Sequence, residues 1–296
     1  MPRVLYGFVL LGTLCFLLIG RHLAASQSAA FDEVTDVGSG YALLHGNWRM
    51  DPEHLPLTKL IAALSLARKL PEIPLPSSNT NHSRWHFGNK VLYGTNAPPL
   101  ELLQAARAPL IWLNALLIPL IGWFTFRVAG LIAAAVAVVL ASTEPLWLAH
   151  ATLVGSDAMP SVLIFATTCL AYLLVHGETK RRNALRVALC ASVALCIASK
   201  YYTPAALVFV WIAAARDAQR AGTLSKLLPE LLGVGLVGAV LGVCFAWGWP
   251  PNPARYLYGL QQVGKTYVPG YTFYAFGDFF GAVHRLYFLE ALAVKV

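Results

Sequence analysis

The feature that most constrains this chain is a series of apolar runs, each close to the length that crosses a lipid bilayer. A spanning helix needs about 20 mainly apolar residues, because each advances about 1.5 Å through a core of about 30 Å. An eighth run starts near Leu286, after seven earlier ones: Val4–Gly20, Pro109–Phe126, Val128–Ser142, Ala158–Val175, Val187–Ser199, Pro204–Ala215 and Leu227–Trp247. Neighbouring runs adjoin at Arg127 and at 200–203, which indicates tight re-entry. The pattern predicts an all-α, polytopic transmembrane bundle of about seven to eight spans.

Composition agrees with a chain that uses lipid as its solvent. Only 12% of the residues are charged, about half of what a soluble domain carries. The net charge of +8 therefore does not indicate a nucleic-acid partner. All five cysteines lie in apolar stretches without paired spacing, which argues against a disulfide framework and a zinc site; they are Cys15, Cys169, Cys190, Cys196 and Cys244.

The basic residues predict an orientation. Those near the ends of the runs fall on one side of the predicted spans: Arg3, Arg127, Lys180, Arg181, Arg182, Arg186, Arg216, Arg220 and Lys226. The positive-inside rule places this side in the cytoplasm. We expect a multi-pass protein of the plasma (inner) membrane with a cytoplasmic N-terminus. The first run also resembles a signal peptide, but its 17 apolar residues favour a retained helix.

Two long segments are then predicted to lie outside, in the periplasm or an equivalent space. Segment 21–106 is the first outer loop, and apolar residues at helical spacing predict an amphipathic helix over 57–70. A short helix is expected at Asp36–Leu44 and an irregular loop over 71–100. Segment 248–285 is the second outer loop. Its many aromatic residues are typical either of a belt at headgroup level or of a platform for sugar or lipid.

Residues that could carry chemistry gather on this outer side. The chain has only 14 acidic residues, so their positions are informative; the candidates are Asp32, Glu33, Glu53, His54, Asp157 and Lys200. Each alone is also compatible with a solvated interfacial charge or, for Asp157, with a helix N-cap. Gly233–Gly238 matches the dinucleotide-binding fingerprint, but it lies inside a predicted span. Close packing between helices explains these glycines better.

The order of several short motifs points to one family. They are Phe31-Asp32-Glu33, then Asp51-Pro-Glu53-His54-Leu55-Pro56-Leu57, Ala106-Arg107-Ala108-Pro109, Pro145–Asp157 and Ala198-Ser-Lys200-Tyr201. This order resembles the GT-C membrane glycosyltransferases, namely the protein O-mannosyltransferases and aminoarabinose transferases of glycosyltransferase family 39 and relatives. Leu55 departs from the proline usual in the family. Family members continue for more spans, so the resemblance implies a C-terminally incomplete chain, with residues 1–296 forming a partial GT-C domain.

The resemblance implies an activity and roles for the candidates. Such enzymes transfer a sugar from a polyprenyl-phosphate donor to a lipid, glycan or protein acceptor outside the membrane. Asp32 is then expected as the general base, with Asp157 next and Glu33 beside it. Lys200 and Arg107 would bind the donor phosphate. Glu53 and His54 would contact the acceptor, and Glu53 matches a position that contacts a divalent metal in some relatives.

Two other classes remain open at this point. A transporter or a non-catalytic membrane scaffold would use the same charges for a solute path or for packing. The chain shows no internal repeat of spans, which transporters often have. An oligosaccharyltransferase-like protein of the same fold would transfer whole glycans instead of a single sugar.

Overall fold

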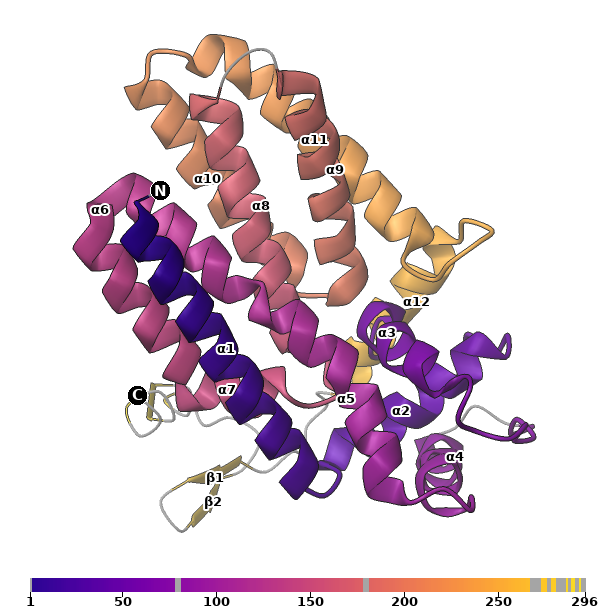
Figure 1. Ribbon diagram of the computed structural model, residues 1–296. Helices are drawn as coiled ribbons and strands as arrows, with labels where there is room; N and C mark the ends of the chain where they lie inside the picture. The colour runs from indigo at the N-terminus through magenta and orange to yellow at the C-terminus, as the bar shows by residue number, and fades with distance from the viewer. Residues whose placement is uncertain are drawn as a thin grey trace.

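The computed structural model describes residues 2–77, 81–177 and 181–266, together with a few residues after 272, and this part is almost wholly helical (Figure 1). Five helical stretches in it are long and apolar enough to cross a membrane. They are α1 (Arg3–Ser26), the run Pro99–Thr143, α8 (Ala158–His176), α9 (Arg182–Ser199) and α11 (Leu224–Phe245). The prediction of a helical membrane protein is confirmed to this extent.

The run Pro99–Thr143 contains α5 (Pro99–Ala115) and α6 (Leu117–Thr143), and α6 doubles back on itself (Figure 1). The reversal is at Gly130, whose backbone has φ 84° and ψ −172°. This region of backbone space is essentially restricted to glycine. The reversal lies three residues beyond the tight re-entry predicted at Arg127.

Small residues let the long helices approach closely. A Cβ on Gly12 of α1 would lie 2.7 Å from the Val138 side chain of α6. A Cβ on Gly238 of α11 would lie 2.8 Å from the Cys190 carbonyl oxygen of α9, and Gly242 meets Ile197 in the same way. The glycine-rich motif in α11 is therefore a packing surface, as its place inside an apolar run predicted.

The two ends of the bundle are formed by different elements (Figure 1). One end, here called the basic end, holds the start of α1, the reversal in α6, the end of α8 and the α10–α11 turn; α10 is Thr203–Arg220. The other, here called the acidic end, holds α2 (Phe31–Leu44), α3 (Pro56–Leu66), α4 (Asn81–Tyr93), α7 (Pro145–Ala151) and α12 (Pro253–Thr266). Two short antiparallel strands, β1 (Phe273–Ala275) and β2 (Asp278–Phe280), follow α12. The eighth predicted span, near Leu286, lies largely outside the described residues.

The helices α2, α3, α4 and α5 share a hydrophobic core at the acidic end. Its fully buried members include Val37, Ala62, Leu66, Val91, Leu92 and Ala106. Gly38 of α2 and Gly88 of α4 meet almost backbone to backbone, since a Cβ on Gly38 would lie 2.5 Å from the Gly88 Cα. The predicted irregular loop over 71–100 is therefore wrong across α4. Few apolar residues mark α4 in the sequence, and contacts with α2 decide which of them are buried.

The predicted helix over 57–70 exists, but it ends at Leu66 and turns a different face inward. Leu64 is one of the apolar residues whose helical spacing predicted this helix, yet it is 63% exposed, whereas Lys59 is only 1% exposed. Ala62 and Ala63 are small enough for α3 to pack closely against α2. Lys59 can be buried as a charged group because its ammonium forms an ion pair with Asp51, described below.

Candidate functional site

The candidate site is centred on Asp51, in the segment between α2 and α3. Its buried carboxylate accepts from Arg84 Nη1 at 2.8 Å and from Lys59 Nζ at 3.0 Å, and its Oδ2 lies 3.2 Å from His54 Nδ1. Burial acts to raise the pKa of Asp51, but the cationic neighbours outweigh it and hold the pKa far below its usual range. Asp51 is therefore ionised at any physiological pH.

Lys59 connects α3 to this segment. Its ammonium donates to the Asp51 carboxylate and to the carbonyl oxygens of Asp51 and His54, at 3.2 and 2.7 Å. An ammonium has three N–H donors, so all of them are engaged. Lys59 is thereby a structural cation that orders residues 51–54.

Asp36 of α2 lies beside this network but is not hydrogen-bonded to it. Asp36 is 2% exposed, its Oδ1 is buried without a hydrogen-bond partner among the described residues, and it lies 3.8 Å from His54 Nδ1. Burial raises the pKa of Asp36 to about 7, against the opposing attraction of His54 and Lys59. Burial lowers the pKa of His54, but Asp51 and Asp36 outweigh it and leave that pKa raised. Asp36 can therefore change charge near neutral pH, and His54 keeps its proton to a higher pH than an ordinary histidine does.

Asp32 comes one helical turn before Asp36 on α2 and is exposed to solvent. Residues four apart lie on the same helix face. Within the described parts of the chain, the Asp32 carboxylate has no hydrogen-bond or ion-pair partner. The same face of α2 thus presents one accessible carboxylate and one buried carboxylate.

Asp36, Asp51 and His54 are also the residues that could hold a metal ion, because one potential ligand atom from each lies within 4.8 Å of the others. The fit is incomplete. Both Asp51 oxygens already contact Arg84, Lys59 or His54, whereas the Asp36 Oδ1 atom has no hydrogen-bond partner among the described residues. Glu53, the residue predicted to contact a metal, is outside this group; its carboxylate lies 3.3 Å from Arg84.

Glu33 and Arg107 form a buried pair away from solvent. Arg107 donates from Nε and Nη2 to Glu33, at 2.8 and 2.5 Å, and its other donors reach the carbonyl oxygens of Ala24, Gln27 and Ser28. All five guanidinium donors are used. Glu33 also accepts from the backbone N–H groups of Ala30 and Val154. Arg107, predicted to bind phosphate, and Glu33, predicted to be catalytic, are thus paired with each other. Their pair joins α1, α2 and α5.

Asp157 and Lys200 form a separate, accessible pair. Lys200 Nζ donates to Asp157 Oδ1 at 2.8 Å and to Ser156 Oγ at 2.5 Å. The Asp157 side chain is 60% exposed, and it makes no capping bond to α8 although it occupies the N-cap position. It borders a cavity of about 240 Å³ together with Glu144, Trp147 and His150.

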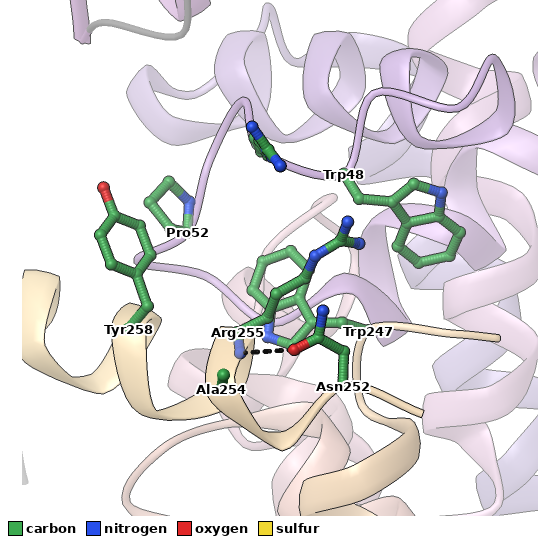
Figure 2. Close-up of a pocket in the computed structure, with 8 residues that line it drawn as sticks. Trp48, Pro52, Trp247, Asn252, Ala254, Arg255 and Tyr258 are labelled. Atoms are coloured by element: carbon green, nitrogen blue, oxygen red, sulfur yellow. Dashed lines mark hydrogen bonds between the residues drawn. The ribbon is translucent and has the colours of Figure 1, made fainter. Parts of the chain in front are cut away.

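A larger cavity, of about 520 Å³, adjoins the Asp51 network (Figure 2). Figure 2 shows its aromatic and cationic walls; the lining residues are Trp48, Arg49, Pro52, Trp247, Asn252, Ala254, Arg255 and Tyr258. Asn252 caps α12, since its Oδ1 accepts from the Arg255 backbone N–H at 3.2 Å. Pro52 stands between Asp51 and Glu53 in the chain, so the network and the cavity share one segment.

Tyr201 joins the Lys200 turn to this cavity. Its hydroxyl donates to the Pro52 carbonyl oxygen at 3.0 Å, and its ring packs edge-on to Tyr256 of α12. The glycine at 259 is needed for this contact, because a Cβ there would lie 1.8 Å from the Tyr201 hydroxyl oxygen.

The structure therefore divides the predicted site residues into three groups. Glu53 and His54 join the Asp36–Asp51 network beside Asp32, Glu33 pairs with Arg107, and Asp157 pairs with Lys200. Sequence reasoning did not single out Asp36, Lys59, Arg84, Arg49 and Arg255, and it named Asp51 only as part of a motif. Of these, Asp36 could have been predicted to share a helix face with Asp32, because the two residues are four apart. No family model, curated protein or solved structure matches this chain.

Proposed function

We propose that this protein is an integral membrane glycosyltransferase that moves a sugar from a polyprenyl-phosphate donor to a hydroxyl acceptor at the outer membrane face. The observation that carries the proposal is the joining of two features on one segment. The cavity of Figure 2 offers aromatic surfaces and arginines, and the residues beside Pro52 belong to the ion-pair network centred on Asp51. Ligand pockets of this kind combine apolar walls with a few placed polar groups.

The proposed topology has seven crossings and an N-terminus in the cytoplasm. The run Pro99–Thr143 counts twice because it reverses at Gly130, and α10 is added despite the charges in its last turns. The basic end then faces the cytoplasm, as the positive-inside rule requires. The acidic end, with both outer segments, faces outward, in the arrangement that the GT-C resemblance implies.

The donor would bind through its phosphate and its sugar. Lys200 is the proposed phosphate ligand from the sequence, and its present partner Asp157 is open to solvent. Arg49 and Arg255 add two guanidinium groups in the cavity, where Trp48, Trp247 and Tyr258 offer flat faces to a sugar ring. The leaving group is a phosphate that already carries negative charge, so it needs cations near it and no proton donor.

Asp32 is the proposed general base, with Asp157 as the second candidate. The acceptor oxygen attacks the anomeric carbon, its proton passes to the Asp32 carboxylate, and the bond from that carbon to the phosphate oxygen breaks. A base must be accessible to the acceptor and ionised. Asp32 is the exposed carboxylate of its helix face, whereas Glu33 is saturated by Arg107. His54 and Glu53 would orient the acceptor.

The test is a transfer assay in membranes with radiolabelled polyprenyl-phosphate sugars. Asp32→Asn should lower the transfer rate by about 10²–10⁴-fold, the usual contribution of a general base. Glu72→Gln is the matched control, because Glu72 is an exposed acid at the same end outside all three groups. Full transfer by folded Asp32→Asn protein would remove the base assignment. No transfer from any donor by the folded wild-type protein would favour a transporter or scaffold.

A further inference from the structure

A second large cavity lies at the basic end, at the opposite end of the bundle from the Asp51 network. It has a volume of about 520 Å³ and is formed by α6, α8 and the last turns of α10. Its walls include Phe124 and Val128 of α6, Tyr172 of α8 and Phe209 of α10. None of these residues takes part in the proposed transfer reaction.

Two arginines of α10 line this cavity. Arg216 and Arg220 are four residues apart and lie on the same helix face. Both are exposed, and neither forms an ion pair with a carboxylate in the described parts of the chain. The acidic residue of the same wall, Asp217, is already engaged, because its Oδ2 lies 2.6 Å from His176 Nε2. Among the described residues, the edge of the cavity therefore carries two guanidinium groups without an ion-pair partner.

The remaining wall is apolar and opens sideways. Phe124 and Tyr172 pack edge to face with ring centroids 5.4 Å apart. Phe209 is 73% exposed and Val128 is 62% exposed, so the apolar wall continues onto the outer surface of the helices. In a chain with membrane-length helices, that surface faces lipid tails. A ligand that fits both parts has an anionic head and an apolar tail.

We propose that this cavity binds an anionic phospholipid of the surrounding leaflet. Arg216 and Arg220 hold the phosphate, since a guanidinium offers paired donors that match phosphate oxygens. One acyl chain lies against Phe124, Tyr172 and Phe209. A bilayer lipid is favoured over a soluble anion because the apolar wall reaches the lipid-facing surface, where a soluble anion would gain nothing. The site is independent of the proposed enzyme activity.

The experiment measures lipid binding to the purified, delipidated full chain. Phosphatidylglycerol and phosphatidylcholine are titrated, and retention is followed by native mass spectrometry and by the rise in Tm. A basic residue near an anionic lipid surface contributes about fivefold in affinity. Arg216→Gln with Arg220→Gln should thus weaken phosphatidylglycerol binding by about 25-fold, and replacement of both by Lys should restore part of it.

The matched control is Arg3→Gln with Arg181→Gln, which removes two exposed charges from the same end outside the cavity. We expect this variant to bind phosphatidylglycerol like the wild type. Equal losses in both double variants, or equal binding of the two lipids by the wild type, would overturn the proposal. So would displacement of the lipid by millimolar inorganic phosphate, which would assign the arginines to a soluble anion.

Discussion

Replacing Asp36 by Asn should stabilise the protein at alkaline pH and leave it nearly unchanged at acid pH. Asp36 is buried, and its Oδ1 lacks a hydrogen-bond partner among the described residues. The uncharged amide has nearly the same shape, so it should avoid the cost of burying an ionised group. The perturbation therefore isolates the charge of a single side chain.

The magnitude follows from the pKa of Asp36, which burial raises from 3.8 to about 7. Between these pH values the folded chain holds a proton that the unfolded chain has lost, so stability falls as the pH rises through this window. Three pKa units correspond to about 4 kcal/mol. At pH 8 the variant should then melt higher than the wild type by on the order of 5 °C.

The neighbouring groups shape the remaining pH dependence. The raised pKa of His54 contributes stability below its unfolded value, and this is lost as the pH rises through its folded value. The free energy of unfolding of Asp36→Asn should therefore still fall at alkaline pH, but by less than that of the wild type. Asp51 has the opposite sign, because its depressed pKa contributes stability above the unfolded value that is lost only at strongly acid pH.

The assay is thermal unfolding in detergent at pH 4 and pH 8, which lie at the two ends of the window between the unfolded and folded pKa values of Asp36. Asp51→Asn is the control of opposite sign, because it leaves Lys59 without a charged partner and Arg84 with Glu53 alone, and it should lower Tm at both pH values. A wild-type protein that equals or exceeds Asp36→Asn in Tm at pH 8 would refute the reasoning. It would mean that the ionised Asp36 carboxylate has a cationic partner, such as a metal held with Asp51 and His54.

Three further predictions concern other parts of the chain. Arg107→Lys should destabilise the fold by about 3–5 kcal/mol, because a lysine cannot serve the carboxylate and three carbonyl oxygens that Arg107 serves; a normal Tm with lost transfer would instead support its phosphate role. Gly130→Ala should lower the free energy of unfolding by about 1–3 kcal/mol, because of the backbone conformation of Gly130 alone. Gly233 is equally free of close neighbours but lies inside a helix, so Gly233→Ala should be neutral or stabilising. Equal Tm values for the two variants would contradict this. Lys200→Gln should raise the KM for the polyprenyl-phosphate donor about tenfold with little change in Tm, as expected for one lost charge-assisted contact; an unchanged KM would remove Lys200 from the donor site.

The helices that could be predicted from the sequence are those whose burial is decided by local composition. Apolar runs of bilayer length predict α1, α8, α9 and α11, because hydropathy is a property of consecutive residues and needs no tertiary contact. The glycines of α11 were also readable, because small residues inside a span have few other uses. The α4 helix was not, since its burial depends on Val34 and Gly38 of α2 about 50 residues away.

The candidate site shows the same division. Asp32, Glu53, His54 and Lys200 were found because charged residues near apolar runs are few. The residues that form ion pairs at the site were not predicted as pairs, because a sequence shows where a charge is but not which residue neutralises it. Arg107 finds Glu33 across 74 positions, and Arg84 finds Asp51 across 33. Lys59 lies in the helix predicted over 57–70, and only the fold of residues 51–54 gives it buried partners.

The most direct test of the central claim is photo-crosslinking of a polyprenyl-phosphate sugar that carries the reactive group on its sugar. The purified chain would be labelled in detergent micelles and the modified peptides identified by mass spectrometry. We predict modification within 47–55 and 247–259, competed by unlabelled donor and reduced by Arg255→Gln. Labelling that is not competed, or that falls only at the basic end around 216–220, would contradict the assignment of the Figure 2 cavity as the donor site.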